Sequence, residues 1–287
     1  MSESLNNDTI KYEKNIVEYI YVVDNKLYSK TKTIHIINNK FNIPIIGVFI
    51  TEKNKENEFF LKPKLVYNDP FRVKGSSYLA LCDIYDEKGE PYKNNLRQKL
   101  LSSFDNPEKI NKLHPVIIFK QQYNLKYKDK KKEIEIVHNI KYLAEKHYLY
   151  CMETNMDIDG YEVKDNKVTY TIGPNSILGA SDDLWMSRFI LNRLVYNEEY
   201  KINYDGKLSL NYSDNDTKKE SGIKVINKYF KNMGFTNSKG KIKSEFKEIF
   251  LPIQTKLLKK GSFEDRRHKS NTDPYSILKN FSKLYKN

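Results

Sequence analysis

Hydrophobic and polar residues alternate along the first third of the chain, which predicts β-strands there. The alternating stretches are rich in Val, Ile, Tyr and Phe, and Asn, Asp, Gly or Pro residues bound them. They cover residues 15–24, 26–37, 59–67 and 77–86. A short turn at Asp24-Asn25 separates the first two strands. Four or five strands within about 75 residues predict a small mixed sheet.

The pattern changes after Pro91, where strands and helices alternate. We expect a helix over 94–104, a strand over 114–127, a helix over 134–155 and a strand hairpin over 161–174 with Asp165-Asn166 at its tip. In the predicted helix over 134–155, four apolar or aromatic residues recur at three- and four-residue spacing, as on one face of a helix. They are Ile140, Leu143, His147 and Tyr150.

A further helix is predicted over 181–200, with Ser181 or Asp182 as its N-terminal cap. The last third of the chain is polar and predicted to be rich in helix, and its segment 239–262 is interrupted at Pro252. The sequence contains no glycine-rich phosphate loop, internal repeat or long low-complexity linker. These elements together predict an α+β fold.

Composition indicates a globular, non-membrane protein. Of 287 residues, 39% are hydrophobic and 30% charged, which excludes a disordered chain. The polar N-terminus lacks a secretory signal, and no run of about 18 apolar residues occurs, so we expect a cytoplasmic protein. Cys82 and Cys151 lack C-x-x-C spacing. Two buried reduced thiols are the simpler interpretation; a disulfide or a zinc site is the alternative.

The net charge of +13 suggests a polyanionic partner such as nucleic acid. However, Lys, Asn, Ile and Tyr are abundant together, as in A/T-rich genomes such as those of large DNA viruses or parasites, and such a bias raises lysine content without selecting a binding face. A viral origin would make the protein virus-associated. The basic run Lys126–Lys132 is either a solvated turn or a contact for an anion, and the 22 tyrosines either stack on bases or belong to the core and sheet surfaces.

Seven stretches, in order, resemble eukaryotic-type glutamine synthetases over roughly residues 16–285. They are YIYVVDNKLYSKTKTI, NDPFR, YLALCDIYDEKGEPYKNNLRQKL, HPVIIFKQQYNL, GYEVKDNKVTYTIGP, DDLWMSRFILNRL and KKGSFEDRRHKSNTDPYSIL. The resemblance implies a polar tail (1–14), a small β-grasp-like domain (15–92), and a shortened glutamine synthetase-type catalytic-domain fold (93–287) with a curved antiparallel sheet and flanking helices. Family members form their sites between subunits of stacked rings, which implies self-association.

The resemblance also implies a reaction, in which ATP phosphorylates glutamate and ammonia displaces the phosphate with help from Mg²⁺ or Mn²⁺. Two metal-ligating glutamates of the family's E-Q-E-Y strand correspond here to Lys120 and Gln122, and a further one corresponds to Thr169. The family's ligating histidine corresponds to Ser209. Lysine repels a divalent cation; we therefore expect Lys120 to pair with a remaining carboxylate.

Three family positions are retained. Glu162 and Glu264 correspond to metal ligands, and Arg266 corresponds to an arginine near the phosphates. Glu162 could equally be a solvated or salt-bridged strand residue, and the FEDRR segment could be kept for structure, with Asp265 and Arg267 paired inside the domain. Several nucleotide- and substrate-binding segments of the family have no counterpart.

We therefore predict a glutamine synthetase-like pseudoenzyme that acts as a scaffold or interaction protein. It would have no intact catalytic residues, no metal site and no cofactor. The alternatives are a residual glutamate–ammonia ligase that uses ATP and Mg²⁺ or Mn²⁺, and a nucleic-acid or polyanion binder.

Overall fold

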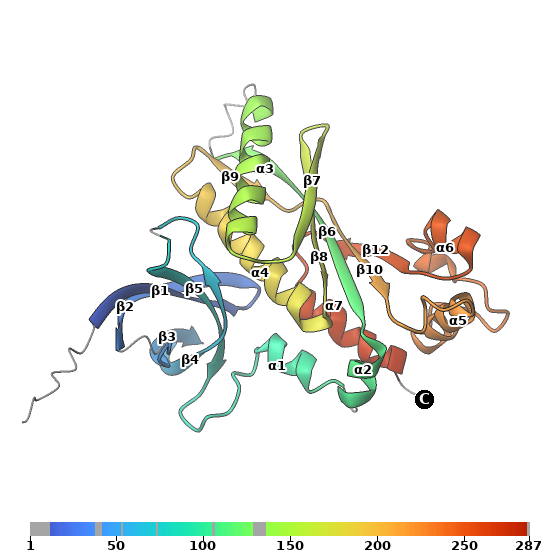
Figure 1. Ribbon diagram of the computed structural model, residues 1–287, viewed down its shortest axis with the longest axis horizontal. Helices are drawn as coiled ribbons and strands as arrows, with labels where there is room; N and C mark the ends of the chain where they lie inside the picture. The colour runs from blue at the N-terminus through green and yellow to red at the C-terminus, as the bar shows by residue number, and fades with distance from the viewer. Residues whose placement is uncertain are drawn as a thin grey trace, which may run out of the picture. The chain divides into compact units, whose positions relative to one another are not determined.

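The computed structural model describes residues 12–37, 42–52, 54–72, 74–104, 107–128 and 136–285. Most of the polar N-terminal tail and most of the basic run Lys126–Lys132 therefore lie outside the described residues. The chain divides into two compact units, Met1–Asn95 and Leu96–Asn287. The fold is mixed α and β, as predicted, and each unit is described by itself (Figure 1).

The first unit is a five-stranded sheet with the order β2-β1-β5-β4-β3. Its strands are β1 (Tyr12–Val23), β2 (Lys26–Ile37), β3 (Ile46–Glu52), β4 (Lys55–Asn68) and β5 (Ser77–Tyr85). β1 and β5 are parallel and the other pairs are antiparallel. The sheet is strongly curled, as a contact between its two edge strands shows: Lys30 Nζ on β2 donates to Gly47 O on β3 at 2.7 Å.

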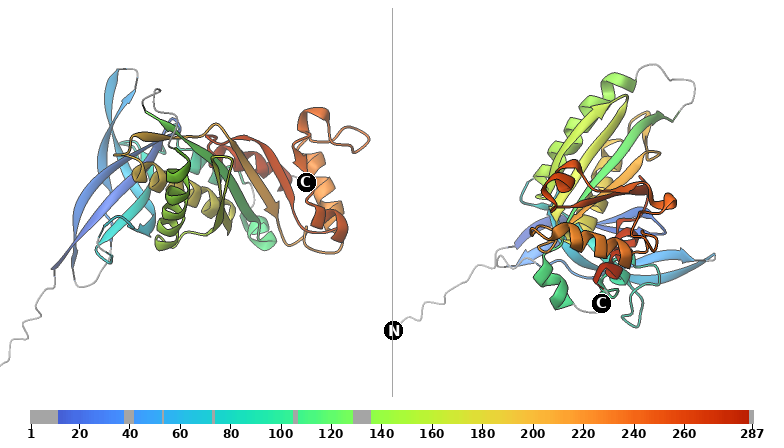
Figure 2. Two further views of the ribbon diagram at one scale, coloured as in Figure 1. Left: turned by 90° about the horizontal axis from the view of Figure 1, so that it is seen from above. Right: turned by 90° about the vertical axis from the view of Figure 1, so that its right-hand side faces the viewer.

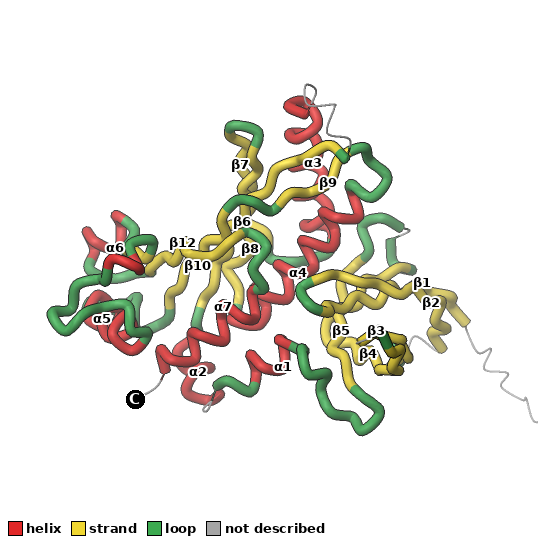
Figure 3. The backbone as a smooth tube through the Cα atoms, turned by 180° about the vertical axis from the view of Figure 1, so that it is seen from behind, coloured by secondary structure: helices red, strands yellow, loops and turns green. Residues whose placement is uncertain are grey.

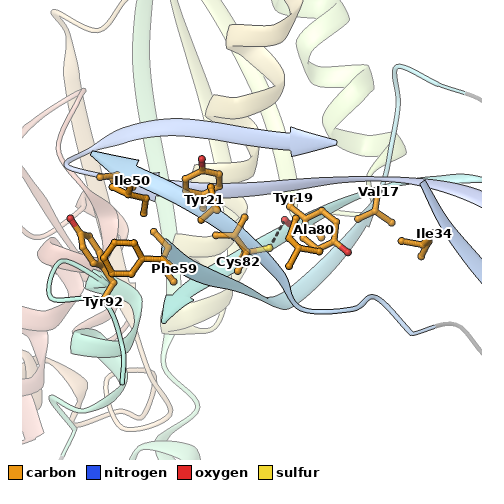
Figure 4. Close-up of a cluster of buried hydrophobic side chains, with 14 residues drawn as sticks. Val17, Tyr19, Tyr21, Ile34, Ile50, Phe59, Ala80, Cys82 and Tyr92 are labelled. Carbon is orange, nitrogen blue, oxygen red and sulfur yellow. Dashed lines mark hydrogen bonds between the residues drawn. The ribbon is translucent and has the colours of Figure 1, made fainter. Parts of the chain in front are cut away.

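One face of this sheet forms a hydrophobic core (Figure 4). Alternate residues of the strands point into it, among them Val17, Tyr19, Leu61 and Cys82. Cys82 is buried and free, as expected for a reduced thiol, and its burial raises its pKa far above the usual value. The mixed sheet with a parallel central pair is the observed architecture. A β-grasp-like domain stays a prediction.

The second unit contains a sheet with the order β11-β12-β10-β6-β8-β7, and β9 pairs with the end of β6. All neighbouring strands are antiparallel. The strands are β6 (Val116–Tyr127), β7 (Ile158–Lys164), β8 (Lys167–Asn175), β9 (Tyr200–Asn203), β10 (Lys207–Ser213), β11 (Ile249–Phe250) and β12 (Phe263–Lys269). The predicted hairpin is confirmed, with Asp165 and Asn166 in its two-residue turn.

Helices pack on one face of this sheet (Figures 2 and 3). α3 (Ile136–Glu153) contacts β6, β7 and β8, and α4 (Ile177–Leu194) contacts α3, β6, β8 and α7 (Pro274–Phe281). The remaining helices are α1 (Leu96–Leu101), α2 (Pro107–Leu113), α5 (Gly222–Asn232), α6 (Ile253–Leu258) and the short 3₁₀ helices η1 (Ser244–Phe246) and η2 (Ser282–Tyr285). No helix among the described residues is long and apolar enough to cross a membrane.

Two expectations about helix ends were wrong. α4 begins at Ile177, and Ser176, not Ser181 or Asp182, accepts the capping hydrogen bond from Gly179 N. Ser181 and Asp182 lie inside the helix and are buried, and Asp182 binds Arg97. In the segment 239–262, helix occurs on the C-terminal side of Pro252 as α6, whereas the residues before it form η1 and β11.

Candidate functional site

The face of the second sheet that carries the helices and the opposite face differ in burial. Along β6, Ile117, Phe119 and Gln121 are fully buried, whereas Lys120 is exposed and Gln122 is half-buried. This alternation follows from the period of two along a strand. The residues on the less buried side form what we call the open face, and most of the sequence-predicted site positions lie on it.

The strand register brings these positions together. Lys120 is opposite Thr171 on β8 and Ser209 on β10. Gln122 is opposite Thr169, which is in turn opposite Glu162 on β7. The strand register therefore makes these positions neighbours on the open face.

Sequence reasoning missed two members of the open face, Thr171 and Asn211. Each follows a predicted site position by two residues, so the period of a strand would have placed it on the same face. Both are half-buried, and Asn211 is opposite Glu264 on β12. The centre of the open face thus carries hydroxyl and amide side chains around Lys120.

Glu264 and Arg266 bind each other. Arg266 Nε lies 2.6 Å from Glu264 Oε1 and its Nη2 lies 3.1 Å from Oε2, a bidentate ion pair. The Arg266 guanidinium also lies 4.3 Å from the centre of the Phe250 ring. Glu264 is buried. Both of its oxygens are therefore occupied by a side chain of the same strand.

The adjacent residues of this segment form a second pair, as the sequence analysis anticipated. Arg267 Nε and Nη2 bind the two oxygens of Asp265 at 2.9 and 2.6 Å, and His268 Nε2 lies 3.2 Å from Asp265 Oδ2. Burial by itself would raise the pKa of Asp265, but the hydrogen bonds from Arg267 and His268 hold that pKa well below its usual range. This carboxylate is charged and structural.

Lys120 does not behave as expected. In the described part of the chain it makes no ion pair, so the predicted pairing with a remaining carboxylate is wrong. The register explains this, since its direct neighbours on both sides are hydroxyl residues and not acids. Its ammonium group faces solvent. Glu162 is likewise exposed on β7.

The donor set of the open face does not fit a divalent metal. Among the described residues, no three His, Cys, Asp or Glu side chains lie close enough to hold a metal ion. Glu162 and Glu264 are on strands separated by β8, β6 and β10, which corresponds to roughly 19 Å along a flat sheet. Mg²⁺ needs oxygen ligands at about 2.1 Å, so the two glutamates cannot share an ion.

The described lysines of the basic run have partners on the molecule. Lys126 Nζ lies 3.4 Å from Asp205, and Lys128 Nζ donates to Tyr196 O at 3.2 Å. Residues 129–132 lie outside the described residues. Cys151 on α3 is free and buried, as expected, and its burial raises its pKa.

A cavity of about 810 Å³ lies elsewhere in this unit. It is mainly apolar, with Leu100, Phe104, Val116 and Ile177 among its lining residues, and His114 and Asn111 among its polar ones. None of the sequence-predicted site residues lines it. Its position gives no reason to connect it with the open face.

Comparison with known proteins gives one consistent result. No protein-family model matches the chain. Curated relatives include glutamine synthetase N-1 of Phaseolus vulgaris (26% identical over 280 residues, 78% of each chain), cytosolic isozyme 1-5 of Arabidopsis thaliana (26% over 341 residues, 96% of each chain) and the nodule isozyme of Medicago sativa (24% over 329 residues, 92% of each chain). The similarity to these enzymes extends over both compact units.

Proposed function

Since the chain belongs to the glutamine synthetase family, we propose that it is a catalytically inactive member that serves as a scaffold or interaction protein. The observation that carries this proposal is the open face, where Lys120 is opposite Ser209 and Gln122 is opposite Thr169. The sequence resemblance assigns these four positions to the family's metal ligands. Phosphoryl transfer depends on metal ions and positively charged groups that neutralise the phosphates. The donor set present does not fit such ions.

The retained residues add to this support. Glu264 is paired with Arg266, and among the described residues neither Glu264 nor Glu162 belongs to a group of three possible metal ligands. The alignment to the Arabidopsis enzyme covers 341 residues, more than the 287 of this chain, so some positions of that relative have no counterpart here. This agrees with the missing substrate-binding segments expected from the sequence.

The direct test is calorimetric titration of ATP with Mg²⁺ or Mn²⁺ into the full chain, together with an assay for glutamine formed from glutamate, ammonia and ATP. We expect neither heat of binding nor product. Micromolar, metal-dependent ATP binding that disappears in Glu264→Ala would overturn the proposal. Product formation would reinstate the ligase alternative.

The register offers a gain-of-function test. Glu162, Thr169 and Gln122 form one row across three neighbouring strands. The double variant Thr169→Glu/Gln122→Glu therefore places three carboxylates in a row, with neighbours about 5 Å apart at their Cβ atoms. We expect this variant to bind Mn²⁺, detected by loss of the free-ion paramagnetic resonance signal. The matched control Thr169→Ser/Gln122→Asn and the natural chain should not bind. Equal binding by all three would contradict the assignment of this row.

We also propose self-association, by analogy with the family's ring assemblies, and a cytoplasmic location. The polyanion alternative is less well supported, because Lys126 and Lys128 already have intramolecular partners. Salt-sensitive retention on heparin or DNA that is lost on replacing Lys126, Lys128 and Lys130–132 would favour it. Absence of binding at low salt would remove it.

A further inference from the structure

Four buried polar atoms beneath the second sheet have no hydrogen-bond partner among the described residues. They are Gln121 Nε2 and the hydroxyl oxygens of Tyr123, Tyr170 and Tyr204. Gln121, Tyr123 and Tyr170 are each at most 1% exposed. Buried polar groups are nearly always hydrogen-bonded in native proteins, so each unpaired one needs an explanation, such as a bound water or ion.

The four atoms come from adjacent positions on the helix-covered side of the sheet. Gln121 on β6 is directly opposite Tyr170 on β8, and Tyr123 follows Gln121 on the same side of β6. The pairing of Asn124 with Asn203 places Tyr204, the next residue, beside Tyr123. The rings of Tyr123 and Tyr170 are 6.0 Å apart in an edge-on arrangement. We call this group the tyrosine cluster.

Arg188 from α4 adds a buried positive charge to the cluster. Its Nε donates to Gln121 Oε1 at 2.9 Å, and its Nη2 donates to the carbonyls of Ser270 and Thr272, both at 2.9 Å. All three acceptors are neutral. The guanidinium lies 5.9 Å from the centre of the Tyr204 ring. Burial lowers the pKa of Arg188, because a buried charge is disfavoured when its neighbours do not fully compensate it.

The surrounding ionisable groups do not supply a matching negative charge. Asp273 is near Arg188, but its oxygens accept from Trp185 Nε1 at 3.1 Å and Ser276 N at 2.7 Å, and it is not within ion-pair distance of Arg188. Burial raises the pKa values of Tyr123, Tyr170, Tyr204 and Cys151, so these groups stay protonated. His147 hydrogen-bonds to Ser187, and its burial lowers its pKa to about 4, so it is neutral.

The direction of the hydrogen bonds favours an acceptor. Since Gln121 Oε1 accepts from Arg188, its amide nitrogen must be the unpaired end and can only donate. The three protonated phenols can donate as well. Four donors beside an arginine that binds only neutral oxygens form an environment for an anion. We propose that the tyrosine cluster binds a small monovalent anion of the halide class, which stabilises the second unit from within.

Thermal unfolding of the full chain in sodium chloride and in sodium gluconate at equal ionic strength tests this. A ligand bound only by the folded state raises the unfolding temperature, by about 3–6 °C at ten times its dissociation constant. We expect that rise in chloride. Tyr123→Phe and Tyr204→Phe each remove one donor without changing the ring, and should abolish most of the difference between the two salts.

A matched control comes from a buried tyrosine that already has a partner. Tyr275 Oη donates to Asp182 Oδ1 at 2.6 Å, so Tyr275→Phe should lower the unfolding temperature in both salts and keep the chloride-dependent rise. Crystals soaked in bromide should show an anomalous peak within hydrogen-bond distance of Gln121 Nε2. Equal unfolding temperatures in both salts, or an ordered water and no halide at that place, would overturn the proposal.

Discussion

His147 on α3 is buried, and its burial links its protonation to the stability of the fold. Its Nε2 lies 3.1 Å from Ser187 O and 3.0 Å from Ser187 Oγ. Burial lowers its pKa from 6.5 to about 4, against a smaller opposite effect of the hydrogen bond to Ser187. The His147 imidazole therefore binds a proton at a higher pH in the unfolded chain than in the folded chain. The contribution of this residue is complete above pH 6.5 and is lost as the pH falls towards 4.

We expect the free energy of unfolding to fall by about 2 kcal/mol between pH 7 and pH 5 on account of His147. Urea denaturation at both pH values measures this fall. In His147→Asn the fall should shrink by that amount, whereas the exposed His35→Asn should leave it unchanged. An unaltered pH dependence in His147→Asn would show that the buried imidazole is protonated equally in both states.

A second residue-scale prediction concerns the buried pair of Arg97 and Asp182. Arg97 Nε and Nη2 bind the two oxygens of Asp182 at 3.0 and 3.1 Å. Arg97→Met leaves a buried carboxylate without this partner and should cost about 3–5 kcal/mol. Adding Asp182→Asn to that variant should recover part of the loss, as a double-mutant cycle by urea denaturation can measure. No recovery would mean that Arg97 acts through packing alone.

These residues also show where sequence reasoning ends. The open face could be predicted, because Lys120, Gln122 and Thr169 lie on strands whose period of two fixes the side of each residue. The pair of Arg97 and Asp182 is separated by 85 residues and has no local signature. Asp182 was predicted to be a helix cap because the signals for a helix start use only neighbouring residues, and a distant partner such as Arg97 does not enter them.

At the scale of elements, the two Asp-Asn turns are the most predictable features of the chain. Asp24 and Asn25 have φ values of 48° and 62°, and Asp165 and Asn166 have 48° and 57°. Left-handed conformations at both positions are typical of a two-residue hairpin turn, and Asp and Asn tolerate them well. Both turns were therefore apparent from sequence, whereas α2 and the boundaries of α4 were not.

A β-branched residue at position 166 tests this account. Asn166→Val puts a β-branched side chain at φ 57° and should destabilise the protein by about 1–2 kcal/mol, because a branched Cβ crowds the backbone in the left-handed conformation that Asn tolerates. Asn166→Gly should stay within about 0.5 kcal/mol of the natural chain or exceed it, since glycine is favoured at this position. Similar losses for Val and Gly would mean that the Asn side chain, and not the turn conformation, is what matters.

At the scale of the whole molecule, the proposed scaffold role depends on association, and the exposed apolar side chains of α6 are a candidate contact surface. Ile253 and Leu257 are each 75% exposed and Leu258 is 54% exposed, although all three are on the short helix α6. The only buried side chain of α6 is Thr255, whose Oγ1 accepts from Ser262 N at 3.1 Å. Exposed apolar side chains grouped on one short helix are typical of contact surfaces.

Light scattering of the purified chain over a range of concentrations tests self-association, for which we expect a mass above the 34.0 kDa of one copy. If α6 contributes to the contact, Ile253→Ser/Leu257→Ser should reduce that mass without changing the unfolding temperature of the single chain, because both side chains are already in water. The matched control Phe49→Ser, at a 64% exposed apolar residue of β3, should leave the mass unchanged. A monomer at all concentrations would remove self-association and leave a different protein as the partner of the scaffold.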